Sequence, residues 1–434
     1  MSQLLSTAPY RGTRDFLPAE MSVRLQVFQR LYECIERYGF VRYDGPVLEP
    51  AEIYEAKSGR EIADQQLYTL TDRGGRRLAL RPEMTPSVAR MIAASAGQLQ
   101  FPVRWYCNVN CHRYERPQRG RVREHWQINV DTFGADSPAC EMEFFELIHD
   151  MMAAVGGQRD MYVLRVNDRI LLEGILTEIV GIPAPGIRDV SSIIDRWEKY
   201  PRETLAAQAS SLGVTEAQFT QLETALKAGE DIVADLSAEV RERSQIAPVL
   251  ASDARDLITF DPLIVRAFEY YTSTVFEVFD TDPANSRSLF GGGRYSNLTG
   301  LFSHEQIPGF GFGMGDVTLF DFLDAHGLLP TPRNDIDVAV IPLDVDLDSP
   351  ARDIARHLRG AGYRVSTPLT QRKLGKELAR ADKAGADAVV IIGPQDWRTA
   401  TVAVRDLRTG EQATIAVNDV VSAVQRIVGR QPTN

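Results

Sequence analysis

The amino-acid sequence predicts an α+β fold with a helical insertion and a separate C-terminal α/β domain. Residues 1–167 mix a long helical pattern with strand-like runs, and strand-like character returns at 257–315. The stretch between them is almost entirely helical in pattern, which a helical module inserted into a sheet domain explains better than two side-by-side domains. The last segment alternates strands and helices, as small α/β domains do. The expected divisions are 1–167 and 255–329 for the sheet domain, 168–254 for the insertion and 336–434 for the C-terminal domain.

The composition is that of an ordinary globular protein, with 434 residues, 44% hydrophobic and 25% charged. No run of about 18 apolar residues is present, and the first ten residues lack a basic-then-apolar signal pattern, so we expect a cytoplasmic protein without a membrane span. Four cysteines are too few for a disulfide framework and fit a reducing compartment. A net charge of −11 argues against a nonspecific nucleic-acid coat, although it does not exclude a specific RNA partner.

The first sheet segment begins with a helix and a hairpin. Apolar residues form one stripe over 22–38, which predicts a long helix. Residues 67–80 are typical of a hairpin that turns at 72–75. Thr85 can cap a helix that continues through Met91.

A strand-like run at 103–110 and an amphipathic helix at 140–154 follow. Cys107, Cys111 and His112 cluster at the end of that run. No second ligand pair has suitable spacing, so we predict buried thiols and no metal site.

The remaining elements follow from the same periodicities. In the insertion, the helical pattern covers 170–181, 187–200, 203–212 and 216–228. A Pro-containing polar linker at 327–334 separates the C-terminal domain. There, strands are predicted at 336–343, 363–367, 388–393, 401–404 and 412–417, and helices at 351–360, 374–385 and 420–428.

The most informative segment is 113–131, which carries five arginines within its first eleven residues. Planar guanidinium groups bind phosphate oxygens bidentately, so arginines at a turn suit a phosphate-rich substrate. The alternating run that follows places Gln127, Asn129 and Asp131 on one side of a strand. These side chains suit a polar or cationic small molecule. A solvated, charged hairpin is the alternative interpretation.

Three more segments are candidates for a site. Leu80-Arg-Pro-Glu-Met-Thr85 places a carboxylate and a hydroxyl at a helix start, which suits an ammonium group, although such residues more often serve as caps. Residues 265–278 offer Arg266 and adjacent tyrosines before a strand, or simply a β-rich core segment. The glycine-rich runs at 290–295 and 309–315 let a ligand approach the backbone, or serve tight strand packing. They match neither a Walker nor a Rossmann loop.

Together these segments resemble the histidyl-tRNA synthetases, a family of class II aminoacyl-tRNA synthetases. The resemblance rests on Arg11-Gly-Thr-Arg-Asp-Phe, on the 80–85 segment, on the class II motif 2 pattern from Arg113 to Arg121, on Arg266 with Glu269-Tyr-Tyr-Thr, and on both glycine-rich runs. It implies a class II antiparallel sheet flanked by helices, a helical insertion and a C-terminal anticodon-binding domain. It also implies a homodimer built through the motif 1 region near 39–53, which contains Pro46.

The resemblance implies a two-step reaction. The carboxylate of L-histidine attacks the α-phosphate of ATP, with Mg²⁺ accompanying ATP, and histidine passes from the adenylate to the 3′ end of tRNA-His. The implied catalytic residues are Arg113 and Arg266. Histidine would be bound by Glu83, Thr85, Gln127, Asp131, Tyr270 and Tyr271. ATP would be bound by Arg113, Glu115, Arg121, His125, Arg266, Gly313 and Gly315, and tRNA by Gln118, Arg119, Lys376 and Arg380.

Several positions depart from the family pattern, and two of them bear on ATP binding. Thr318 stands where the family usually has an arginine that packs on adenine and reaches the γ-phosphate, and His125 stands where an aromatic residue usually stacks on the other face of adenine. Two other interpretations remain open. One is a catalytically silent, histidine-sensing paralogue like the regulatory subunit of ATP phosphoribosyltransferase, and the other is a histidine-activating enzyme with a non-tRNA acceptor. Such regulators lack an anticodon-binding domain, whereas 336–430 look like a complete one.

Overall fold

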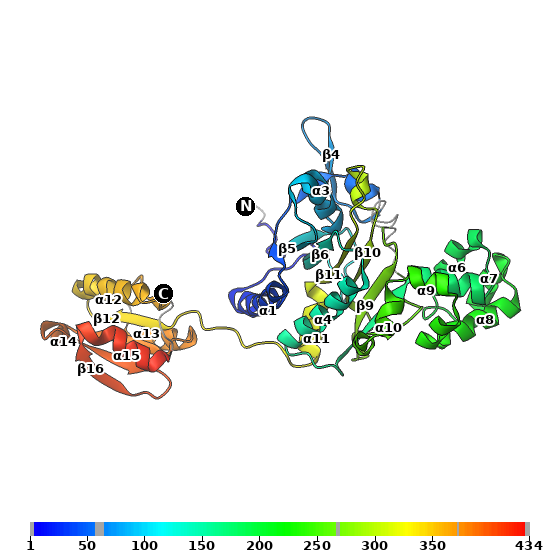
Figure 1. Ribbon diagram of the computed structural model, residues 1–434. Helices are drawn as coiled ribbons and strands as arrows, with labels where there is room; N and C mark the ends of the chain where they lie inside the picture. Colours follow the sequence, from blue (N-terminus) through cyan, green and yellow to red (C-terminus); the bar gives the residue numbers. More distant parts are fainter. Residues whose placement is uncertain (1–3, 57–64, 266–269, 371–372, 430–434) are drawn as a thin grey trace. The chain divides into compact units, whose positions relative to one another are not determined.

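The structure is a computed structural model that describes residues 4–56, 65–265, 270–370 and 373–429. The chain divides into two compact units, Met1–Pro330 and Thr331–Asn434. Each unit has its own sheet and its own hydrophobic core (Figure 1). Among the helices of the described segments, none combines the length and the apolar character that a bilayer crossing requires.

The first unit is built on an eight-stranded sheet with the order β1-β5-β6-β11-β10-β9-β7-β8. The inner strands from β5 to β7 run antiparallel, and a two-residue strand pairs in parallel at each edge. This arrangement confirms the predicted antiparallel sheet. The strands are β1 Val41–Arg42, β5 Val103–His112, β6 Glu124–Phe133, β7 Tyr162–Asp168, β8 Thr259–Phe260, β9 Thr274–Asp280, β10 Ser288–Tyr295 and β11 Gly309–Gly315.

Helices cover both faces of this sheet. On one face, α1 (Pro18–Arg37), α4 (Pro138–Ala154) and α11 (Asp316–Ala325) form the main core with alternate strand residues such as Ile128 and Val130 (Figure 1). On the other face, α3 (Thr85–Ser95) packs on a smaller core that includes Phe133 and Tyr295. Because successive strand residues point to opposite faces, Gln127, Asn129 and Asp131 lie on the α3 face.

Most of the predicted elements in this first part are present. The helix predicted at 22–38 begins earlier, at Pro18, because proline is well suited to a first helical turn. The hairpin is confirmed as β3 (Thr69–Thr71) and β4 (Arg77–Leu80), which with β2 (Leu48–Pro50) form a three-stranded sheet beside the short helix α2 (Glu52–Glu55). The capping role predicted for Thr85 is wrong, because Met84 occupies the N-cap position and Thr85 is the first helical residue.

A helical segment interrupts the sheet between β7 and β8. Asp168, at the end of β7, accepts hydrogen bonds from the Ile170 amide at 2.8 Å and from the Ser244 hydroxyl at 2.7 Å, so one buried carboxylate joins the start and the end of the segment. The predicted helix at 187–200 ends at Ile194. The helices are α5 Arg169–Gly174, continued by a π-helical turn at Ile175–Ile179, α6 Ile187–Ile194, α7 Arg202–Ser211, α8 Glu216–Lys227, α9 Ala238–Arg243 and α10 Ile246–Leu250.

The second unit is a five-stranded sheet with the order β13-β12-β14-β15-β16. Helices α12 and α15 pack on one face, and α13 packs on the other. The predicted strands and helices of this α/β domain are confirmed, whereas α14 was not predicted. The elements are β12 Val338–Pro342, α12 Asp348–Gly360, β13 Val365–Ser366, α13 Leu374–Lys383, β14 Ala388–Ile392, α14 Pro394–Arg398, β15 Thr401–Asp406, β16 Gln412–Ala416 and α15 Val420–Val428.

Candidate active site

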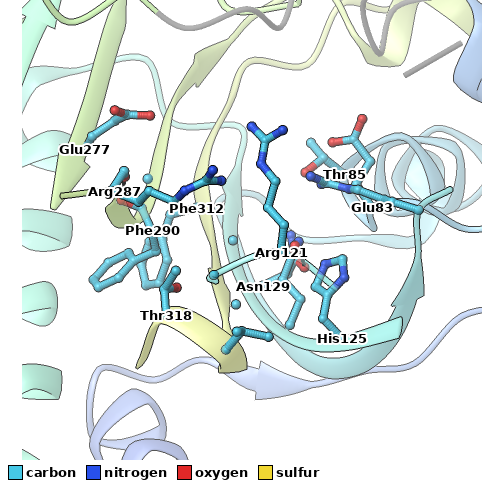
Figure 2. A pocket seen from close by; sticks show the side chains of 18 of the residues that line it. Glu83, Thr85, Arg121, His125, Asn129, Glu277, Arg287, Phe290, Phe312 and Thr318 are labelled. Carbon is cyan, nitrogen blue, oxygen red and sulfur yellow. Dashed lines mark hydrogen bonds between the residues drawn. The ribbon is translucent and has the colours of Figure 1, made fainter. Parts of the chain in front are cut away.

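A cavity of about 630 Å³ opens on the α3 face of the large sheet. Most of the residues that the sequence analysis assigned to a site line this one cavity (Figure 2). They come from the start of α3, from the loop between β5 and β6, from β6, from the approach to β9, and from β11. The assigned residues in the lining are Glu83, Thr85, Arg113, Glu115, Arg121, His125, Gln127, Tyr270, Tyr271, Gly313 and Gly315.

Glycines on β11 make room for the polar residues of β6. Gly311 pairs with Asp131, and Gly313 pairs with Asn129. A Cβ atom on Gly311 would lie 2.4 Å from a carboxylate oxygen of Asp131, and one on Gly313 would lie 2.5 Å from the side-chain amide nitrogen of Gln127. Real Cβ atoms do not approach neighbours so closely. The glycine-rich run therefore shapes the floor of the cavity.

Asp131 is a buried carboxylate beneath this floor, only 1% exposed. The Tyr295 hydroxyl donates a hydrogen bond to Oδ1, while Oδ2 has no hydrogen-bond partner among the described residues. Burial raises the pKa of Asp131 to about 7, against the lowering effect of the Tyr295 hydrogen bond and with a smaller raising effect of Glu83. Asp131 itself does not line the cavity in the described structure, but Gly311 and Tyr295, which lie against it, do.

A second carboxylate lies at the α3 end of the cavity. Glu83 is buried and accepts a hydrogen bond from the Tyr270 hydroxyl at 2.9 Å. Thr85 begins α3 next to it. On β6, the Gln127 side-chain amide donates to Asn129 Oδ1 at 2.8 Å. These groups give this end of the cavity an acidic, hydrogen-bonding lining, which suits an ammonium group.

Arginines line another part of the cavity. Arg113 donates from Nε to the Pro82 carbonyl at 3.0 Å, which orients its guanidinium. The loop between β5 and β6 is closed by two main-chain hydrogen bonds between Gln118 and Arg121, at 2.9 and 3.0 Å. Arg121 Nε lies 3.4 Å from the Glu115 carboxylate. Such a loop presents guanidinium groups to a phosphate chain.

His125 is half-buried next to these arginines. Burial is the largest cause that lowers its pKa, to about 3, and the positive charge of Arg113 lowers it further. The imidazole is therefore neutral at physiological pH. A neutral ring can stack on a nucleobase, which a protonated one would do less well among cations.

Two other charged clusters hold the site together. Asp316, fully buried at the start of α11, forms ion pairs with Arg14 at 2.9 Å and Arg24 at 2.8 Å. Arg294, also buried, forms two hydrogen bonds with the Glu141 carboxylate, at 2.7 and 2.6 Å. Arg14 and Arg294 belong to motifs on which the family resemblance rests. Both pair with buried carboxylates of the protein, so they stabilise the fold around the site.

Some assigned residues lie elsewhere. Gln118 and Arg119 line a neighbouring cavity of about 340 Å³, where Arg119 donates to Asn285 Oδ1 at 3.0 Å. Lys376 and Arg380 are exposed on α13 of the second unit. Arg266, assigned as catalytic, lies outside the described residues.

The cavity also contains residues that the sequence analysis did not assign: Lys199, Glu277, Arg287 and Tyr295. Tyr295 could have been found, because it ends the Gly-Gly-Gly-Arg-Tyr motif and strand alternation places it on the α3 face. Its hydroxyl donates the hydrogen bond to Asp131. No sequence signal marks Arg287, which precedes the motif.

The described residues contain no group of three or more histidine, cysteine or acidic side chains able to hold a metal ion, and Cys107 and Cys111 are buried free thiols. Mg²⁺ bound together with a nucleotide needs less, commonly one or two carboxylates besides phosphate oxygens and water. Glu115 and Glu277 line the cavity and offer such oxygens. The donor set therefore fits Mg²⁺ that accompanies a nucleotide.

The chain resembles known proteins along nearly its whole length. The family model described as histidyl-tRNA synthetase matches residues 12–317, and that of an anticodon-binding domain matches 337–427. The histidine–tRNA ligase of Leptospira biflexa is 37% identical over 98% of both chains, and that of Pyrococcus horikoshii is 35% identical over 97% of this chain and 99% of the other. The crystal structure of histidyl-tRNA synthetase from Nostoc sp. PCC 7120 superposes with a TM-score of 0.80, at 26% identity, over 98% of this chain and 100% of the other. The chain belongs to the histidyl-tRNA synthetase family.

Proposed function

We propose that this protein is a histidine–tRNA ligase, which activates L-histidine with ATP and transfers it to the 3′ end of tRNA-His. One observation carries the proposal. A single cavity joins an acidic, hydrogen-bonding end with Glu83 and Gln127 to an arginine-lined part with Arg113 and Arg121. An amino acid that reacts with a nucleoside triphosphate needs an acidic surface for its ammonium group next to a basic surface for the phosphates.

The adenylation step needs alignment more than acid–base chemistry. A carboxylate oxygen of histidine forms a bond to the α-phosphorus of ATP, and the bond to the bridging oxygen breaks as pyrophosphate leaves with the electron pair. The nucleophile is already anionic, so no general base is required. Arg113 stabilises the charge that develops on the α-phosphate, and Arg266 is proposed for the opposite side. Glu115 or Glu277 would hold the Mg²⁺ that accompanies ATP, and the ion would supply positive charge to the phosphate chain.

Histidine occupies the acidic end. Glu83, Thr85 and Gln127 bind its ammonium group, with Tyr270 holding Glu83 in place. Asp131 and Tyr271 bind the imidazole nitrogens. The oxygen of Asp131 without a partner in the described structure supports this role, because a buried acceptor is stabilised by an N–H donor. A site of this kind rejects analogues that lack the ring nitrogens.

ATP occupies the arginine-lined part. His125 stacks on adenine. Arg121 binds the distal phosphates, and Glu115, in the same loop, lies on the adenine side of ATP. Gly313 and Gly315 let the nucleotide approach the backbone of β11, since neither carries a side chain. The low pKa of His125 supports stacking by a neutral ring.

The remaining assignments concern tRNA and assembly. Gln118 and Arg119 bind the acceptor end, and Lys376 and Arg380 bind the anticodon region. The chain forms a homodimer through 39–53. Exposed apolar residues in that range, Val41 at 63% among them, support an interface there. The proposed compartment is the cytoplasm.

Histidine-dependent exchange of pyrophosphate into ATP, followed by aminoacylation of tRNA-His, tests the proposal. We expect both activities. Absence of exchange would identify a silent histidine sensor, and exchange without charging of tRNA would identify a different acceptor. Other amino acids should support exchange poorly.

A further inference from the structure

We propose that Arg287 binds the distal phosphates of ATP and takes the place of the arginine that Thr318 replaces. This inference rests on the proposed use of ATP. It assigns a substrate-binding role to a residue outside every motif that carried the family resemblance.

Arg287 is placed by the strand that follows it. It immediately precedes β10, and its side chain lines the main cavity together with Arg121 and Thr318. A Cβ atom on Gly120 would lie 3.2 Å from Arg287 Cδ and 3.7 Å from Thr318 Cγ2. The stem of Arg287 therefore crosses Gly120 at the turn of the β5–β6 loop, directly beside Thr318. Figure 2 shows its guanidinium pointing into the cavity, toward the side chain of Arg121.

Thr318 has a different role in this arrangement. Its hydroxyl donates a hydrogen bond to the main-chain carbonyl of Leu289, two residues after Arg287. This bond joins α11 to β10 and fixes the strand that carries Arg287. A short side chain at 318 also leaves space, since Thr318 lines both the main cavity and the neighbouring one. Thr318 therefore carries no positive charge itself, but it stabilises the strand that positions the charge of Arg287.

The electrostatic environment favours an anionic ligand. Within the described part of the chain, Arg287 forms no ion pair. The nearby Arg121 is paired with Glu115 at 3.4 Å, whereas Glu277, the described carboxylate on the Arg287 side of the cavity, forms no ion pair with Arg287. Two guanidinium groups that point toward one space repel each other, and a polyphosphate bound between them would attract both and outweigh that repulsion.

An RNA phosphate is the competing ligand, because Arg287 is exposed and also lines the smaller cavity with Arg119. The geometry favours ATP. Arg287 shares the main cavity with His125, Gly313 and Gly315, the residues proposed for the nucleotide. A cation opposite them reaches the part of ATP that extends away from the adenine.

Calorimetric titration with two probes tests the assignment. Mg·ATP carries all three phosphates, whereas histidyl-sulfamoyl-adenosine carries adenosine and histidine but no β- or γ-phosphate. We expect Arg287→Ala to weaken Mg·ATP binding about 10- to 100-fold, the scale of one or two lost charge-assisted hydrogen bonds, and to leave the sulfamoyl probe within about twofold. Arg287→Lys should recover part of the ATP affinity, because it keeps the charge without the bidentate geometry.

Arg255→Ala is the matched control. This arginine is 54% exposed, forms a surface ion pair with Glu230 and lines neither cavity, so its loss should change neither affinity. Unchanged ATP affinity in Arg287→Ala, or equal weakening of both probes, would refute the assignment. A raised KM for tRNA with unchanged ATP affinity would assign Arg287 to RNA instead. If the unaltered protein bound Mg·ATP without histidine-dependent exchange, the proposed function would fail while the Arg287 comparison remained valid.

Discussion

Replacing Asp131 with asparagine should stabilise the folded first unit at neutral and alkaline pH while abolishing histidine binding. The carboxylate is buried, and burial raises its pKa to about 7 from an ordinary value of 3.8. Folding therefore costs more free energy when Asp131 is ionised than when it is protonated. Asparagine has nearly the same shape, can still accept the hydrogen bond of Tyr295, and carries no charge.

The magnitude follows from linkage. Between pH 3.8 and pH 7 the folded state holds a proton that the unfolded state has released, so the free energy of unfolding falls as pH rises, by about 1.36 kcal/mol per pH unit. Above pH 7 both states are ionised, and the full cost of about 4 kcal/mol is present. The stability difference between Asp131→Asn and the unaltered chain should therefore grow by about 3 kcal/mol from pH 5 to pH 8.

Urea unfolding at several pH values measures this difference. A Trp397→Phe background restricts tryptophan fluorescence to the first unit, because the other three tryptophans lie within it. Asp324→Asn, an exposed position on α11, is the control and should show no such trend. A difference that stays constant from pH 5 to pH 8 would refute the reasoning. Retained histidine affinity in Asp131→Asn would separately refute the assignment of this carboxylate to the imidazole.

Three further predictions concern the nucleotide, the cavity floor and tRNA. Arg113→Ala should slow histidine-dependent pyrophosphate exchange by roughly 10²–10³ with little change in histidine affinity; a near-normal rate would exclude Arg113 from the reacting phosphate. Gly311→Ala should cost roughly 1–3 kcal/mol in thermal or urea unfolding and block histidine binding, because its Cβ would lie 2.5 Å from a β6 carbonyl, whereas Gly97→Ala, with nothing within 4 Å, should be silent. Reversing Lys376 and Arg380 to glutamate should raise the KM for tRNA about tenfold at low salt but leave pyrophosphate exchange unchanged. A loss of charging that did not diminish with added salt would contradict phosphate contacts.

Much of the fold was accessible from the sequence because hydrophobic periodicity is local. Alternation on β6 predicted which residues share a face, and the structure places Gln127 and Asn129 together in the cavity lining. Helix ends were less accessible. The predicted helix at 187–200 ends at Ile194, because the remaining residues form turns that a helical pattern does not distinguish from a helix.

The side-chain contacts of individual site residues could not be predicted from the sequence, because they depend on the order of strands in the sheet. Asp131 contacts Tyr295 because β11 lies between β6 and β10, and Gly311 has no side chain to separate them. The sequence places these residues 164 positions apart. Arg287 was missed for the same reason, since its relation to Thr318 exists only after β10 and α11 are packed.

The glycine-rich motifs on β10 and β11 mark this site in the sequence, although glycines have no side chains that could contact a ligand. Pairing puts Gly291 opposite Gly313 and Gly293 opposite Gly311, so two adjacent strands lack side chains at the same places on the α3 face. Glycine weakens a strand interior, and this cost has to be offset elsewhere. Phe310, which alternates with the glycines, is fully buried on the opposite face and packs in the main core. The same short segment thus stabilises the sheet through one face and leaves space for a ligand on the other. The alternation of glycine with large apolar residues along β11 therefore serves both the core and the cavity.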